Sequence, residues 1–273
     1  MDSLQIAEQL IKRQEARSEG KKLVLLVLDG LGDIRHGDNE FRTPLEDART
    51  PNLDKLAHHS AVGRIIPVDH GITPGSGPAH LGLFGYDPRE VEIGRGVMEV
   101  VGMGMALQPG DVAARANFCT MKDGKVTDRR AGRPSTEDGT RTVERLREKI
   151  RTIGDVEVIL LAGQGHRFGV VFRGPGLAAG VNDTDPHENG RPLHEARAET
   201  EAARKTAEVI NEFVRLAQEA LAGSEPINGV MTRGVSCRPD IPTLADRFGL
   251  RCAAIATYPM YRGLASLVGM DLL

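Results

Sequence analysis

The chain has 273 residues, 40% hydrophobic and 27% charged, which suffices for one large or two modest domains with buried cores. Its formal net charge of −3 gives no overall attraction to nucleic acid or anionic membranes, so any anion site must come from local clustering of basic residues. No apolar run approaches membrane-spanning length. The three widely spaced cysteines show neither a disulfide framework nor metal-ligand spacing, which fits a reducing cytoplasm.

The first part of the chain predicts alternating strands and helices. We expect a short amphipathic helix before Lys22, where apolar residues recur at helical spacing. Leu23–Asp29 is a continuous apolar run bounded by charge and glycine, which indicates a strand buried on both faces. A helix that starts at Pro51, a short strand over Ala61–Val68 and a short helix from Ser76 follow.

After Pro88 the chain becomes rich in Gly, Val and Met and then returns to regular patterns. The predicted elements here are a hairpin at 122–125, a helix over Thr136–Ile150, strands over Val156–Leu161 and Gly169–Phe172, a helix over His194–Leu221, a helix over Leu244–Phe248, a strand over Cys252–Ala256 and a helix from Leu264. Alternating strands and helices predict an α/β fold with a mainly parallel sheet. We expect one discontinuous domain, 1–88 with 229–273, and an inserted second domain, 89–228.

Two residues stand where an anion or a metal could bind. Gly75 and Gly77 remove bulk around Ser76, and the helix start beyond it offers unpaired N–H groups, which favours an anion, including a phosphate carried by the serine. A plain helix-capping serine is the alternative. Asp29 ends the first predicted strand next to a glycine, where it could bind a divalent metal or merely cap a loop.

Basic residues form a second group of candidates. Arginine offers planar paired donors that match carboxylate and phosphate, although a solvated surface is the alternative for any single arginine. With 4% aromatic residues and no tryptophan, stacking on single-stranded nucleic acid is poorly supported, so a small polyanion is the better interpretation. A third stretch, VNDTDPHENGRP, holds Asp183, Asp185 and His187, which could be metal ligands but fit better a turn-rich loop with side-chain caps.

Several stretches occur together and in order: VLDGLGD, TPLEDARTPNLDKLA, GSGPAHLGLFGYDP, DRRAGR, GHRF, NDTDPH and YPMYRG. Together they resemble the cofactor-independent phosphoglycerate mutases of the archaeal type, a family of the alkaline phosphatase superfamily. The resemblance runs from about Lys22 to Leu273. It implies an alkaline-phosphatase-like doubly wound sheet, incomplete here, with an inserted α/β domain.

The resemblance also implies a chemistry. Ser76 would be the nucleophile that carries the phosphoryl group as phosphate moves between the 3- and 2-positions of glycerate. Asp29 and Ser76 would be ligands in a site for two divalent metals, manganese, zinc or magnesium. Phosphoglycerate, a small molecule, would be the partner of a cytoplasmic protein with no nucleic acid or membrane partner, and a homo-oligomer is compatible with the resemblance. The substrate site would be lined by Arg130, His166, Arg167, Arg233 and Arg262.

The sequence departs from the family pattern in one respect. The family supplies further metal ligands late in the chain, an Asp-x-x-x-His motif, an Asp-His pair and a last His, and these motifs are absent before Leu273. We therefore expect this chain to be the front part of such an enzyme and to lack mutase activity alone. The alternatives are another enzyme of the superfamily, a phosphatase or phosphopentomutase, and a non-catalytic module that binds phosphoglycerate.

Overall fold

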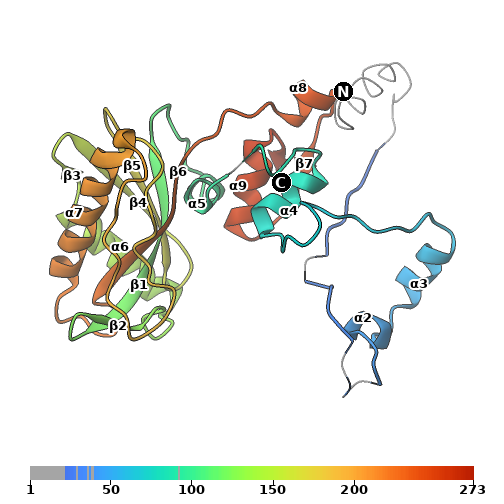
Figure 1. Cartoon of the computed structure of the whole chain (residues 1–273), viewed down its shortest axis with the longest axis horizontal. Coiled ribbons are helices and arrows are strands. Elements are labelled where there is room, and N and C mark those ends of the chain that lie inside the picture. The colour runs from blue at the N-terminus through green and yellow to red at the C-terminus, as the bar shows by residue number, and fades with distance from the viewer. Residues whose placement is uncertain (1–21, 29, 36, 38–39, 92) are drawn as a thin grey trace. The chain divides into compact units, whose positions relative to one another are not determined.

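The computed structural model describes residues 22–28, 30–35, 37, 40–91 and 93–273 (Figure 1). These residues fall into two compact units. The smaller contains the described residues up to Ile66, and the larger contains Pro67–Leu273. The predicted helix before Lys22 and the candidate metal ligand Asp29 lie outside the described residues.

The smaller unit contains two short helices, α2 (Pro44–Asp47) and α3 (Pro51–His58). The side chain of Thr43 caps α2 by accepting from the Glu46 amide, and the Glu46 carboxylate accepts from the Thr43 amide in return. Helix α3 starts at Pro51 as predicted, because a proline loses no hydrogen bond in the first helical turn.

The strand predicted over Leu23–Asp29 is wrong for the residues that are described. Residues 22–28 have no strand pairing, and Leu23 is 92% exposed. The predicted strand over Ala61–Val68 is also absent, and Val62 is 78% exposed. A buried strand needs neighbouring strands for hydrogen bonding and side chains packed on both faces. Among the described residues, these two segments have neither.

The larger unit is built on an antiparallel sheet in the order β2-β1-β5-β4-β3, and β6 also pairs with β1. The strands are β1 (Val112–Lys122), β2 (Lys125–Asp128), β3 (Thr152–Ile153), β4 (Val156–Ala162), β5 (Arg167–Arg173) and β6 (Gly229–Cys237). The prediction of a mainly parallel sheet is therefore wrong for this sheet, whereas the alkaline-phosphatase-like sheet itself stays a prediction.

The predicted hairpin at 122–125 is confirmed and shows why the chain reverses here. Asp123 and Gly124 both have positive φ, 50° and 73°, as a two-residue hairpin turn requires. Strand β6 was not predicted. The predicted division places its residues in the first domain, but they pair with β1 from Val112 to Cys119. The division into two domains stays a prediction.

One face of the sheet carries the main hydrophobic core, covered by α6 (Thr136–Lys149) and α7 (Arg204–Leu221) (Figure 1). Phe118 and Phe168 stack with their ring centroids 4.6 Å apart. Phe172 meets Phe213 of α7 edge to face at 5.6 Å. The helix predicted over Thr136–Ile150 is confirmed within one residue.

Helix α7 begins ten residues later than predicted. The chain before it forms a short bridge between Val181 and Ala198, and a 3₁₀ turn over Glu201–Ala203 leads into the helix. Asn211 of α7 explains the difference, because its side chain accepts from the Ala196 amide at 2.8 Å and donates to the Ala196 carbonyl at 2.9 Å. These bonds satisfy the backbone of an extended segment in place of a further helical turn.

The other face of the sheet is covered by α5 (Arg95–Gly102), a helix that was not predicted. A Cβ atom on Gly96 would lie 2.4 Å from the Ala113 carbonyl oxygen, so the helix backbone lies directly against β1. Helix α9 (Pro259–Leu267) packs on α5 equally closely, since a Cβ atom on Gly263 would lie 1.9 Å from the Met98 carbonyl oxygen. Glycine is required at both contacts.

The remaining elements are α4 (Ser76–Leu83), α8 (Leu244–Phe248) and a parallel pair of two-residue strands, β7 (Ala253–Ala254) and β8 (Asp271–Leu272). The helices predicted from Ser76 and over Leu244–Phe248 are confirmed. Within the part of the chain that the structure describes, no helix combines the length and apolar character needed to cross a membrane.

Substituting Gly96 tests the contact that positions α5. We expect Gly96→Ala to lower the free energy of unfolding by about 1–3 kcal/mol, because the added methyl group must push the helix away from β1. Urea unfolding measures the change. Arg95→Ala, one residue earlier at an exposed position, is the control and is expected to cost less than about 0.5 kcal/mol. Equal stability of the two variants would contradict the close packing.

Candidate functional site

The pleat of β1 divides its side chains between the two faces of the sheet. Phe118 joins the hydrophobic core, so Arg115 and Asn117 belong to the opposite face. Gly169 is the register partner of Arg115 on β5, and a Cβ atom there would lie 2.7 Å from Val100 of α5. Because directly paired residues point to the same face, Arg115 lies on the side of the sheet that carries α5.

Three arginines come together on this face from three adjacent strands. Arg115 of β1 is the register partner of Arg233 of β6, and Asn117 is the partner of Arg167 of β5. The Nε atoms of all three arginines, together with the Asn117 Oδ1 atom, are buried without a hydrogen-bond partner. A buried face that offers unpaired cationic donors suits an anionic ligand.

Two other elements contribute to the arginine face. Tyr258, the N-cap residue of α9, accepts a hydrogen bond at 2.8 Å from Arg167 Nη1, and the guanidinium lies 5.8 Å from the ring centroid. Glu99 of α5 is 3% exposed. Burial raises the pKa of Glu99, and the charges of Arg115 and Arg167 act in the opposite direction.

His166 stands beside this face as a neutral ring. Burial, reinforced by the charges of Arg167, Arg115 and Arg130, lowers the pKa of His166 to about 4, whereas Asp128 acts to raise it. At neutral pH the imidazole therefore carries one N–H donor and one acceptor nitrogen. It can hydrogen-bond a hydroxyl group without adding positive charge.

Arg130 is held in a tight left-handed loop. Its neighbours Ala131 and Arg133 have φ of 48° and 56°, and Gly132 between them has 71°. The Asp128 carboxylate stabilises this conformation by accepting from the Arg130 amide at 2.8 Å and the Gly132 amide at 2.7 Å. Such a backbone persists where its surroundings fix it, so Arg130 extends from a preorganised loop.

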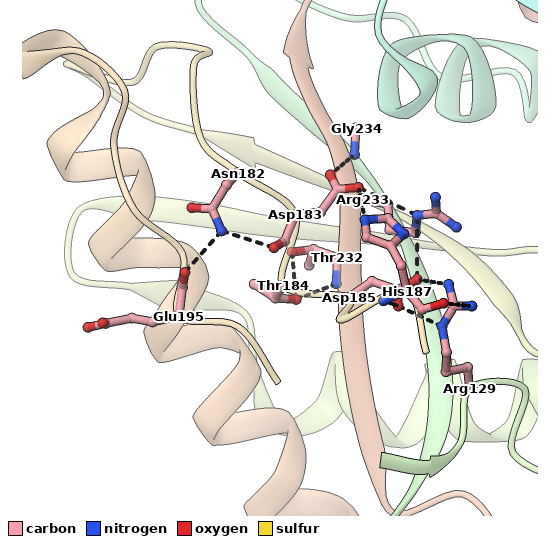
Figure 2. Close-up of polar contacts among 10 residues, drawn as sticks. All are labelled: Arg129, Asn182, Asp183, Thr184, Asp185, His187, Glu195, Thr232, Arg233 and Gly234. Carbon is pink, nitrogen blue, oxygen red and sulfur yellow. Dashed lines mark hydrogen bonds and ion pairs between the residues drawn. The ribbon is translucent and has the colours of Figure 1, made fainter. Parts of the chain in front are cut away.

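The third stretch of candidates, the loop 181–187, is fastened to β6 and to Arg129 (Figure 2). Asp183 accepts from the Gly234 amide at 2.7 Å, and the Thr184 hydroxyl accepts from the Thr232 amide at 2.8 Å. The loop is therefore tied to the strand that carries Arg233. Asp185 accepts two bonds from Arg129, which agrees with a capped loop more than with a metal-binding segment.

The structure brings together four of the five predicted substrate-binding residues. Arg167 and Arg233 lie near Arg115, and His166 lies near Arg115, Arg167 and Arg130. Arg262 on α9 instead donates to the Ala256 carbonyl at 3.1 Å. The roles of all five stay predictions.

Sequence reasoning missed Arg115, Asn117, Glu99 and Tyr258. The first two carried a usable signal, because polar residues two apart in the otherwise apolar run VAARANF mark one face of a strand.

Comparison with known proteins shows which protein family the chain resembles. A family model described as 2,3-bisphosphoglycerate-independent phosphoglycerate mutase matches residues 57–228, which is more than half of the chain. The chain belongs to this family. The family is one of isomerases, and the resemblance inferred from the motifs is confirmed.

Relatives in the family are similar along nearly the whole chain. A protein of Thermotoga neapolitana named "Probable 2,3-bisphosphoglycerate-independent phosphoglycerate mutase" is 50% identical over 92% of the chain, which spans 62% of that relative. A protein of Aquifex aeolicus with the same name is 47% identical over 99% of the chain and 67% of its own length. The chain thus spans about two thirds of the length of these relatives.

Two solved structures are similar to the chain, and one of them is named as a member of the same family. The cofactor-independent phosphoglycerate mutase of Thermoplasma acidophilum is 33% identical with a TM-score of 0.62, over 90% of this chain and 68% of that one. A protein of Pyrococcus horikoshii is 30% identical with a TM-score of 0.71, over 90% of this chain and 60% of that one.

The metal site expected for the family is not assembled by the residues that the structure describes. Among them, no group of three or more His, Cys, Asp or Glu side chains is placed to hold a metal ion. Ser76 is exposed at the start of α4, where His80 Nδ1 lies 2.7 Å from the Ser76 carbonyl oxygen. The described residues do not form a metal centre by themselves, so the binding of manganese, zinc or magnesium stays a prediction.

The low pKa of His166 can be tested through stability. Between pH 6.5 and 4 the unfolded chain binds a proton on this ring that the folded chain does not, so the free energy of unfolding falls as pH is lowered through this range. His166→Gln is expected to reduce that pH dependence, and urea unfolding at pH 7 and pH 5 measures it. The exposed His194→Gln is the control. An NMR signal of His166 that titrates near pH 6.5 would contradict the assignment.

Proposed function

We propose that the protein acts in the interconversion of 3-phosphoglycerate and 2-phosphoglycerate and that the arginine face holds the substrate. Membership of the mutase family supports the reaction. The observation that carries the proposal is the set of three arginines on one sheet face whose buried Nε atoms have no hydrogen-bond partner. A role in glycolysis or gluconeogenesis and a cytoplasmic location follow from this proposal.

The charge of the arginine face matches the charge of the substrate. Phosphoglycerate carries a carboxylate and a phosphate, and planar guanidinium groups bind both with paired N–H donors. Arg115, Arg167 and Arg233 offer such groups from a sheet whose backbone fixes their spacing. Neutral His166 adds a donor and an acceptor for a glycerate hydroxyl without further charge.

Ser76 is proposed as the phosphoryl acceptor. Its hydroxyl oxygen would form a bond to phosphorus as the bond from phosphorus to the substrate oxygen breaks, which leaves glycerate and a phosphoserine. Transfer to the other glycerate oxygen then regenerates the serine. The arginine face would retain glycerate between the two transfers. Two divalent metals, with Asp29 and Ser76 among their ligands, stay part of this proposal.

Arg167 provides the test of the binding site. We expect Arg167→Lys to raise the dissociation constant of 3-phosphoglycerate about tenfold, since lysine keeps the charge but loses the paired donors and the bond to Tyr258. Isothermal titration calorimetry on the chain measures it. Arg141→Lys is the matched control, because Arg141 pairs with Glu137 on α6, which covers the opposite face of the sheet. Unchanged binding by both variants would exclude the arginine face as the substrate site.

Ser76 is tested by removing its hydroxyl group. The test uses a preparation of the protein that has measurable mutase activity on 3-phosphoglycerate. In it, Ser76→Ala is expected to lower turnover by about 10⁴-fold or more, as loss of a nucleophile does. Mass spectrometry should find phosphate on Ser76 in the wild type and none in the variant. Ser135→Ala is the control, because Ser135 caps α6 without a proposed chemical role. Turnover by Ser76→Ala that equals the control would remove Ser76 from the mechanism.

A further inference from the structure

Asp185 is a fully buried carboxylate that the proposed reaction does not use. Its side chain is 0% exposed. Arg129 donates to it twice, from Nε to Oδ1 and from Nη2 to Oδ2, each at 2.7 Å, and the His187 amide donates to Oδ1 at 2.9 Å. Burial acts to raise the pKa of Asp185, but the bonds from Arg129 and His187 bring it below its usual range. Asp185 is therefore ionised at neutral pH.

This buried charge faces Arg233. The Arg233 Nε atom lies 3.4 Å from Asp185 Oδ2 and 3.5 Å from Asp183 Oδ2. These are ion-pair distances without the alignment of a hydrogen bond, and Nε is left without a hydrogen-bond partner. In Figure 2 the two terminal nitrogens of Arg233 point away from both carboxylates. Within the described part of the chain, the ion pairs of Arg233 with these two carboxylates are thus both made through its Nε atom.

The backbone keeps the two carboxylates at this position. Asp183 accepts from the amide of Gly234, the residue that follows Arg233 on β6. Thr184 accepts from the Thr232 amide through its hydroxyl and donates its own amide to the Thr232 carbonyl at 3.0 Å. The loop and the strand are therefore joined on both sides of Arg233, so bonds to the β6 backbone hold the loop carboxylates near this arginine.

We propose that Asp183 and Asp185 are positioning residues that hold Arg233 by its Nε side, so that both terminal nitrogens face the carboxylate or phosphate of the substrate. The proposal rests on the proposed function of the arginine face. A guanidinium has five donors in one plane, and fixing one side of that plane directs the remaining pair. Preorganisation of this kind strengthens binding because less side-chain freedom is lost when the ligand arrives.

The chain contains a matched control for Asp185. Asp111 is 2% exposed and accepts from Arg173 Nε at 2.9 Å, from Arg173 Nη2 at 2.7 Å and from the Gln108 amide at 2.8 Å. It is the same kind of buried pair with the same number of donors. In the described part of the chain no ion pair joins Asp111 to an arginine of the arginine face. Losing either pair should destabilise the fold, but only Asp185 should affect the ligand.

Calorimetry with 3-phosphoglycerate on the chain compares Asp185→Asn with Asp111→Asn. We expect the dissociation constant to rise about tenfold for Asp185→Asn and to change less than about twofold for Asp111→Asn. Adding Asp185→Asn to Arg233→Lys should have no further effect, because the carboxylate acts through Arg233. Equal changes in both aspartate variants, or an additive double variant, would overturn the proposal.

A readout without ligand separates this proposal from the proposed function. Proton NMR of the arginine Nε–H groups, with Arg233 assigned by Arg233→Lys, should show faster solvent exchange of the Arg233 signal in Asp185→Asn and not in Asp111→Asn. Asp183 is half-buried, and Asp183→Asn should also make the Arg233 Nε–H group exchange faster with solvent. This variant replaces Asp185→Asn if Asp185→Asn does not fold. If the wild type binds no 3-phosphoglycerate, the proposed function fails. If the Arg233 signal is unchanged in these variants, the positioning proposal fails.

Discussion

Three guanidinium groups share one face of a small sheet, and their mutual repulsion is the constraint that the surrounding structure satisfies. Arg115, Arg167 and Arg233 stand on adjacent strands, where like charges destabilise one another. The compensation comes from different elements: Glu99 from α5, Tyr258 from the start of α9, and the two carboxylates of the loop 181–187. The opposite face, by contrast, is closed by aromatic and aliphatic packing. A sheet with one charged and one apolar face can present an anion site while its core stays dry.

The elements that the sequence predicted well are those with strong local signals. The helix after Ser135, the hairpin at Asp123-Gly124 and the helix from Ser76 each carry their own cap, turn or proline. The prediction that failed most clearly is the strand over Leu23–Asp29, which rested only on a continuous run of apolar residues. An apolar run indicates burial, but the partner strands that would bury it are a non-local property.

The candidate site was predictable to the extent that its residues lay in recognisable motifs. Arg130, His166, Arg167 and Arg233 were predicted this way, and the sheet register then added Arg115 as the partner of Arg233. Helix α5 escaped prediction because glycines, which disfavour a helix, occupy two of its eight positions. The structure shows the reason for Gly96, since the helix backbone touches β1 there. Tertiary contact outweighed local propensity.

The left-handed loop around Ala131 and Arg133 has a consequence for the thermodynamics of ligand capture. The loop is fixed by the Asp128 carboxylate before any ligand arrives, so the backbone entropy of placing Arg130 is lost during folding. A ligand that binds Arg130 as proposed would have only the side chain left to order. The strain of left-handed non-glycine residues is carried by the folded state at all times, so the loop trades a small share of global stability for a fixed backbone at Arg130.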